Sequence, residues 1–195
     1  MSDERGDIEV RTRAAANEQR WSDAVTFAIR GYGEEILGYL VAMTRSETDA
    51  NDAFSLFAED LWKGLPRFRW ECTLRTWAYG LARHALARIR RDPHRKRAVP
   101  LSDAHLAGLV EEMRSRTQTF LRTETRDKVA KLRAEMDPDD QSLLILRLNR
   151  KLAWRDIALV LDPDTKAADV EKRAASLRKR FERLKIELKE RAAAG

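Results

Sequence analysis

The chain has 195 residues, of which 43% are hydrophobic and 36% are charged, and its formal net charge is +6. This length suits one ordinary domain or two small ones, and so high a charged fraction suits small helical domains with much exposed surface. With only 8 glycines and 5 prolines, the composition disfavours a β architecture rich in tight turns, and the single cysteine, Cys72, excludes an internal disulfide. We therefore expect an all-α fold.

The positive charge falls in two separate blocks. Residues 67–97 carry 10 Lys and Arg against 2 acidic residues, and residues 165–195 carry 10 against 5. Residues 1–66, ahead of the first block, carry 7 against 13. Two basic surfaces are what a polyanion contacted at two places requires, although either block alone is also compatible with a solvated helix face.

Residues 1–20 are polar and rich in Arg and Ala, and we expect them to form a frayed or disordered lead-in. They lack the apolar core of a secretory signal, and no apolar run approaches the roughly 20 residues that span a bilayer. We expect a soluble, cytoplasmic protein without membrane insertion.

Residues 21–91 are expected to form the first helical domain. Thr48 and Asp49 are placed to cap a helix with an apolar stripe, which ends near Pro66. A short loop over 67–73 then sets aromatic residues between arginines, and the helix that follows has one apolar and one basic face. This combination suits single-stranded nucleic acid, because flat rings stack on unpaired bases while arginines hold the backbone.

Two tryptophans in this region have different expected roles. Trp70, in the polar loop, is the better candidate for a base contact. Trp77 lies on the apolar stripe of the helix and is better explained as part of the core.

Residues 92–122 are interpreted as a linker that contains some helix. Ser102 is placed to cap that helix. Residues 123–191 are expected to form the second helical domain. Its stretch LAWRDIA (residues 152–158), followed by a very basic last helix, is typical of a helix-turn-helix, whose last helix enters a major groove. For this stretch alone, an ordinary helical bundle with a solvated last helix stays the alternative.

Three groups of motifs resemble the extracytoplasmic-function (ECF) sigma factors, a sigma-70-like class of small initiation factors of bacterial RNA polymerase. TDANDAFSLF (residues 48–57) resembles the acidic helix that docks on the polymerase clamp. WAYGLARHA with RIRR (within residues 77–91) resembles the helix that faces the melted −10 element. DDQSLL, LAWRDIA and VEKR (within residues 139–173) resemble the domain that reads the −35 element.

Several features depart from the family pattern, and two of them bear on the expected DNA contacts. His84 stands where the family usually has asparagine, and the segment 162–169 is longer than the usual turn before the recognition helix. The longer turn leaves the register of the −35 contacts open.

The resemblance implies binding to core RNA polymerase, recognition and melting of promoter DNA, and restraint by an anti-sigma factor. It implies three sets of site residues. The DNA-binding residues of the −10 region are Arg67, Arg69, Trp70, Arg75, Tyr79, Arg83, His84, Arg88, Arg90 and Arg91. Those of the −35 region are Lys166, Lys172, Arg173, Ser176, Lys179 and Arg180. The polymerase-binding residues are Asp49, Asp52, Phe54, Glu59 and Asp60.

No catalytic or metal-binding pattern stands out. His84, His94 and His105 lie in separate contexts without metal-ligand spacing to Cys72, and Gly31-Tyr32-Gly33 lacks the rest of a phosphate-binding loop. We therefore expect no enzyme activity, no metal and no cofactor. Two other functions stay open: a stand-alone helix-turn-helix transcriptional regulator, which would bind duplex DNA without polymerase, and a helical adaptor whose basic faces meet an acidic protein.

Overall fold

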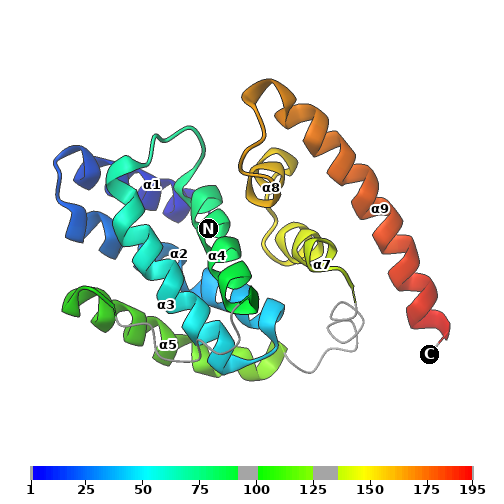
Figure 1. The fold of residues 1–195 in the computed structure, drawn as a ribbon, viewed down its shortest axis with the longest axis horizontal. Helices are drawn as coiled ribbons and strands as arrows, with labels where there is room; N and C mark the ends of the chain where they lie inside the picture. Colours follow the sequence, from blue (N-terminus) through cyan, green and yellow to red (C-terminus); the bar gives the residue numbers. More distant parts are fainter. Residues whose placement is uncertain (1, 92–100, 125–135, 195) are drawn as a thin grey trace. The chain divides into compact units, whose positions relative to one another are not determined.

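The computed structural model describes residues 2–91, 101–124 and 136–194 (Figure 1). Within these ranges helices are the only regular secondary structure, so the predicted all-α class is confirmed. The chain divides into two compact units, Met1–Leu121 and Arg122–Gly195.

The first unit is built from long helices around one apolar core. Its elements are α1 (Ser2–Asn17), α2 (Trp21–Thr44), α3 (Glu47–Gly64), the 3-10 turn η1 (Leu65–Arg67), α4 (Leu74–Arg91) and α5 (Ala104–Glu124). At the centre of the core, Tyr39 of α2 and Tyr79 of α4 meet edge to face, with ring centroids 5.4 Å apart. Both tyrosines are fully buried.

α3 follows the predicted apolar stripe but starts from a different cap. The side chain of Ser46 accepts a hydrogen bond from the Asp49 backbone N–H at 3.2 Å, so Ser46 is the N-cap and the predicted caps Thr48 and Asp49 lie inside the helix. Phe54 and Phe57 are buried on the stripe, with ring centroids 5.5 Å apart.

α1 takes the place of the lead-in expected at residues 1–20. Its Thr12, Ala15 and Ala16 are buried. Side chains as small as these let one helix lie close against another. The partner is α2, where a Cβ on Gly31 would lie 2.7 Å from Ile8 Cδ1. The expectation of a frayed segment is wrong because α1 packs through Ile8 over Gly31 and through small side chains such as Ala15, without a continuous stripe of large apolar residues.

The described part of the expected linker also packs on the first unit, as the first turns of α5; residues 92–100 lie outside the described residues. Asp103 begins the helix, since its carboxylate accepts a hydrogen bond from the Leu106 N–H at 3.0 Å, and Ser102 is not the cap. The apolar face of α5 is buried through four residues, Leu106, Leu109, Val110 and Met113.

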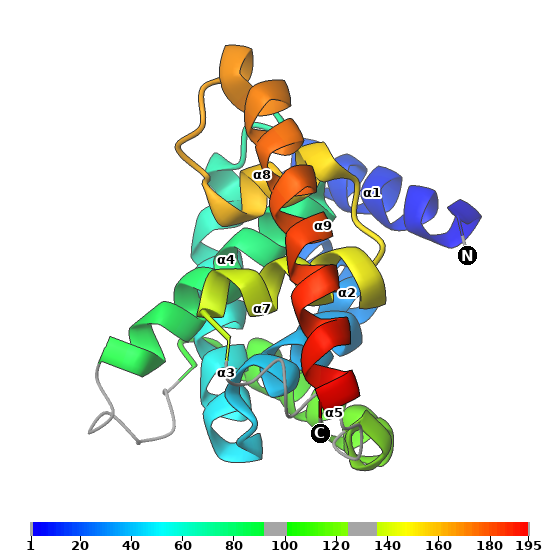
Figure 2. The same ribbon diagram turned by 90° about the vertical axis from the view of Figure 1, so that its right-hand side faces the viewer.

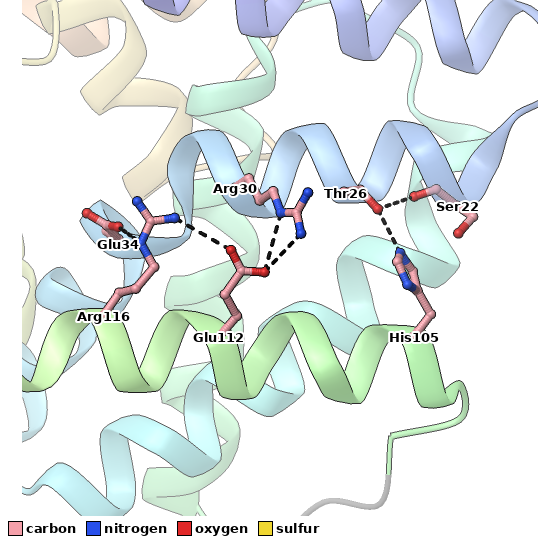
Figure 3. Close-up of polar contacts among 7 residues, drawn as sticks. All are labelled: Ser22, Thr26, Arg30, Glu34, His105, Glu112 and Arg116. Atoms are coloured by element: carbon pink, nitrogen blue, oxygen red, sulfur yellow. Dashed lines mark hydrogen bonds and ion pairs between the residues drawn. The ribbon is translucent and has the colours of Figure 1, made fainter.

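Polar contacts hold α5 alongside α2, and the two helices run in the same direction (Figure 3). His105 Nε2 lies 2.8 Å from Thr26 Oγ1, Arg30 Nη2 lies 3.1 Å from Glu112 Oε2, and Arg116 Nε lies 2.8 Å from Glu34 Oε1. A separate contact reaches α3, where Arg114 Nη2 donates to Ser55 Oγ at 2.7 Å. α5 therefore belongs to the first unit.

The second unit consists of α7 (Pro138–Leu144), the π-helical turn η2 (Ile145–Asn149), α8 (Trp154–Leu161), the 3-10 turn η3 (Ala167–Asp169) and α9 (Val170–Ala194). Asp137 caps α7, as its side chain accepts from the Asp139 N–H at 2.9 Å, and Pro138 occupies the first helical position. α9 packs against both α7 and α8 and extends well past α8 (Figure 2). Its buried stripe comprises Val170, Ala174, Leu177, Phe181 and Leu184.

Candidate nucleic-acid interface

Three aromatic rings, called here the aromatic cluster, lie together just before and within α4. Phe68 stacks on Trp77 with ring centroids 4.5 Å apart and an interplanar angle of 12°, and Trp70 packs on Phe68 with centroids 4.8 Å apart. None of the three residues is fully buried. Trp70 has a φ of 59°, in the left-handed region. Partly open rings of this kind are suited to stacking on an unpaired base.

The N-terminus of α4 is held by two side chains. Thr73 Oγ1 accepts a hydrogen bond from the Thr76 N–H at 3.1 Å. Glu9 of α1 accepts from the Leu74 N–H at 2.9 Å and from the Arg75 N–H at 3.1 Å. The N–H groups that a helix start leaves unpaired are thereby satisfied, and the direction of α4 relative to α1 is fixed.

Some of the predicted −10 residues are accessible to solvent, and others are bound to neighbouring helices. Arg67, Arg69, His84 and Arg91 are exposed, whereas Trp70 and Arg83 are half-buried. The Arg69 guanidinium pairs with Glu71 at 3.2 Å, but both side chains remain largely in solvent.

Tyr79 and Arg75 are not placed as the −10 prediction expects. Tyr79 has no exposed surface, so its prediction as a DNA contact is wrong: the ring is part of the core. Arg75 Nε lies 2.6 Å from Glu35 Oε1, and both side chains are largely buried. Burial by itself lowers the pKa of Arg75, but the hydrogen bonds and negative charge of Glu35, together with smaller effects of Tyr79 and Tyr32, raise the pKa above its ordinary value. Arg75 therefore ties α4 to α2.

The far end of the basic face is tied to neighbouring helices. Arg88 Nη1 donates to both carboxylate oxygens of Asp60 in α3 at 3.0 Å, and His84 Nδ1 lies 3.9 Å from the same carboxylate. Arg90 Nη2 donates to the Met43 backbone carbonyl at 3.1 Å. These contacts anchor α4 on α2 and α3 while leaving part of each side chain open to solvent.

Two of the predicted polymerase-binding residues are buried. Phe54 has no exposed surface, and Glu59 is 7% exposed, so the prediction that these side chains contact a partner is wrong for this structure. Asp49, Asp52 and Asp60 are half-buried and keep accessible surface.

Glu59 instead joins α3 to the segment before α5. Its carboxylate accepts from Ser102 Oγ at 2.7 Å and lies 2.7 Å from Lys63 Nζ. Burial raises the pKa of this carboxyl, but the hydrogen bonds from Lys63 and Ser102 have the larger combined effect and hold its pKa below the ordinary value.

The predicted −35 residues lie mostly on the exposed side of α9. Lys172, Ser176 and Lys179 are exposed and recur at helical spacing along one face, and Lys166 is exposed just before η3. Arg173 is half-buried, with Nε 3.8 Å from the Asp162 carboxylate.

Arg180 differs from these residues because it is bound within the unit. Its Nε donates to the Asp140 carboxylate, and Nη2 lies 3.6 Å from Asp137. Arg180 therefore joins α9 to the start of α7, a role that the sequence interpretation missed.

Glu9 and Arg13 of α1 were also missed. Besides the Glu9 contacts to α4, the Arg13 guanidinium lies over the Trp70 ring, with Cζ 5.5 Å from the centroid. The available signal was two of the glycines in α2: Gly31 admits α1, and a Cβ on Gly33 would lie 2.9 Å from Met113 Cγ of α5. Glycines within a helix mark positions where another helix can approach closely.

Among the described residues, no group of three or more His, Cys, Asp or Glu side chains is placed to hold a metal ion. None of the helices in the described ranges combines the length and the apolar character that a bilayer crossing needs.

A comparison with known proteins supports the family resemblance. Over 141 residues the chain is 29% identical to the RNA polymerase sigma factor YlaC of Bacillus subtilis (strain 168), a match that covers 71% of this chain and 80% of that protein. No protein-family model and no solved structure gives a match. The motifs, the all-helical fold and this relative agree, and together they show that the chain is similar to the sigma-70-like sigma factors of bacterial RNA polymerase.

Proposed function

We propose that this protein is a sigma factor, which binds core RNA polymerase and directs promoter recognition, melting and transcription initiation. The observation that carries the proposal is the similarity to a curated sigma factor over 71% of the chain. Two basic surfaces on two separate compact units support it. In this function the protein has no enzyme activity of its own and acts in the cytoplasm, where polymerase performs the synthesis.

In the first unit, the aromatic cluster and the exposed part of α4 would hold the melted strand of the −10 element. Trp70 offers a ring for an unpaired base, and the exposed Arg67 and Arg69 closely precede it in the chain. Arg83 and His84 extend this surface along α4. Extruding a base costs a few kcal/mol, which stacking and backbone cations together offset.

In the second unit, α8 and α9 would act as the helix-turn-helix that reads the −35 element as duplex. Lys172, Ser176 and Lys179 present a continuous exposed face that suits the major groove and its phosphates. Arg173 is less accessible and is near Asp162, so a base contact from Arg173 would require it to leave that carboxylate.

The polymerase contact would lie on α3, through Asp49, Asp52 and Asp60. These residues keep accessible carboxylates on the acidic part of the chain, whereas Phe54 and Glu59 support the helix from inside. An anti-sigma factor that restrains the protein is part of the proposal and would have to cover one of these surfaces.

Run-off transcription tests the proposal directly. Purified bacterial core polymerase is supplied with a pool of fragments from the source genome, with and without the protein. Discrete transcripts that depend on the protein and share a pair of upstream elements are expected. Tight binding to particular fragments without polymerase, and no transcripts, would favour the stand-alone regulator. No transcripts and no preference for DNA would favour the adaptor.

Matched variants on α9 test the −35 surface. Lys179→Ala should weaken binding of holoenzyme to the promoter and reduce the dependence of affinity on salt by about one phosphate contact, with little change in thermal stability. Arg180→Ala, one residue away, should lower thermal stability because it loses the Asp140 and Asp137 contacts. Equal effects of the two variants on DNA affinity and on stability would contradict this division of roles.

A further inference from the structure

One face of α1 contacts both parts of the surface proposed for the melted strand. Glu9 binds the first N–H groups of α4, and Arg13 lies over the Trp70 ring of the aromatic cluster. Residues four apart lie on the same side of a helix. α1 therefore touches the loop and the helix that would hold an unpaired base.

Glu9 is fixed from two sides. Its carboxylate accepts hydrogen bonds from the backbone of α4 and from the Tyr32 hydroxyl of α2, which lies 3.0 Å away. Burial and the neighbouring carboxylate raise the pKa of Tyr32. The hydroxyl therefore stays protonated and is the hydrogen-bond donor in this contact. A negative charge at the N-terminus of α4 is also favoured by the helix dipole. Glu9 thus holds the start of α4 at a set place relative to α2.

Arg13 lies at the edge of the aromatic cluster. Its side chain is exposed, and within the part of the chain that the structure describes it is found in no ion pair. Its guanidinium borders a ring cluster that is itself partly open to solvent. Guanidinium groups bind phosphate through several N–H donors and also stack on aromatic faces.

Arg11, on the same helix, provides a comparison. It also lies over an aromatic ring, with Cζ 4.3 Å from the centroid of Phe27, but Nη1 lies 3.4 Å from the Asp7 carboxylate. Arg11 is therefore a surface cation with an acidic partner and a ring outside the aromatic cluster.

We propose that α1 is part of the single-strand surface: Glu9 is a positioning residue for α4, and Arg13 supplies a cation to the phosphate beside the base that stacks on Trp70. This inference rests on the proposed function and extends it to a segment without an assigned role. It predicts that removing Arg13 weakens capture of the melted strand while leaving the polymerase contact on α3 unchanged.

The test uses full-length Arg13→Ala, Arg13→Lys, Glu9→Gln and the matched control Arg11→Ala. Each is assembled with core polymerase, and core affinity is measured separately from binding to a promoter fragment recovered by run-off transcription. The fragment is supplied as duplex and as a fork whose −10 non-template strand is single-stranded. The free proteins are also titrated at low salt with fluorescein-labelled single-stranded DNA of random sequence.

We expect Arg13→Ala to weaken binding to the fork by about three- to tenfold and to lower its salt dependence by about one single-strand phosphate contact. Arg13→Lys should fall between the wild type and Arg13→Ala, because it keeps the charge but loses the planar stack. Glu9→Gln should slow opening of the duplex more than it weakens binding to the pre-melted fork, which a general loss of stability would not do. Arg11→Ala and all core affinities should match the wild type.

Two results would overturn the inference. One is equal behaviour of Arg13→Ala and Arg11→Ala on the fork. The other is a loss of fork binding that parallels losses of thermal stability and core affinity, since this would make α1 purely structural. If the wild type supports no transcription, the proposed function fails, and the titration with single-stranded DNA alone decides whether Arg13 binds a strand.

Discussion

Arg75 and Glu35 form an enclosed ion pair in the first unit: Nε lies 2.6 Å from Oε1, Nη2 lies 3.0 Å from Oε2, and the side chains are 13% and 16% exposed. The two parallel hydrogen bonds join α4 to α2 with defined geometry. The same turn of α4 is bound by Glu9 from α1. Three helices therefore meet at the start of α4.

Arg75→Ala should destabilise the first unit, because it leaves the Glu35 carboxylate buried without its partner. We expect a loss of about 3 kcal/mol in the free energy of unfolding, measured by chemical denaturation followed by tryptophan fluorescence. Arg69→Ala is the control, since Arg69 pairs with Glu71 at the surface and should cost less than about 1 kcal/mol. Equal stability of both variants would show that Arg75 is not structural.

Two glycine substitutions should have opposite effects. Gly31→Ala would bring a Cβ within 2.7–2.9 Å of three atoms of Ile8, so it should loosen α1 and cost about 1–2 kcal/mol. Gly80→Ala, in α4, meets nothing within 4 Å and should stabilise by up to about 1 kcal/mol through helix propensity. Thermal melts of the two variants compare these effects, and stabilisation by Gly31→Ala would contradict the close packing of α1.

Glu59 should make stability depend on pH in the acidic range. Its pKa in the folded protein is held below the ordinary carboxyl value. Its contribution to the free energy of unfolding is therefore fully present above about pH 4.3, the pKa in the unfolded chain, and is lost as the pH falls through the folded pKa. The Tm of the wild type should exceed that of Glu59→Gln at pH 7, and the difference should shrink below about pH 4. Glu111→Gln, with its side chain 69% exposed, should show little difference at either pH. A difference for Glu59→Gln that persists at low pH would contradict the assignment.

Trp154 should be an important packing residue of the second unit. Its ring meets Phe181 with centroids 5.3 Å apart, and the guanidinium groups of Arg147 and Arg178 lie over it at 4.7 and 5.7 Å. Trp154→Ala should cost about 2–3 kcal/mol, and Arg178→Ala about 0.5–1 kcal/mol. Near-ultraviolet circular dichroism during unfolding checks the order of these effects, with the exposed Arg183→Ala as the neutral control.

The parts of the fold that sequence reasoning predicted are those set by local rules. The apolar stripe of α3 and the end of this helix near Pro66 depend on residues within a few turns. The docking of α1 and α5 depends on contacts between residues far apart in the chain. Glu9 binds the backbone of Leu74, 65 positions later, and no periodicity within α1 reveals that contact.

The candidate site shows the same division. Basic charge predicted that α4 and α9 face a polyanion, but it did not separate cations that face solvent from cations that hold helices together. Arg75 and Arg180 are of the second kind, and only their burial beside Glu35 and Asp140 distinguishes them from Lys179. An acidic partner that lies 40 positions away leaves no local pattern.

The attachment of α5 changes what an insertion does at different points between α4 and α7. Residues 92–100 join two helices of the same unit, so added residues there enlarge a closed loop, at about 0.6 kcal/mol for each doubling of its length. Residues added after α5 lengthen the tether between the units themselves. On the proposed function, insertions after α5 would change the distance between promoter elements that the protein tolerates, whereas insertions before α5 would leave that distance unchanged.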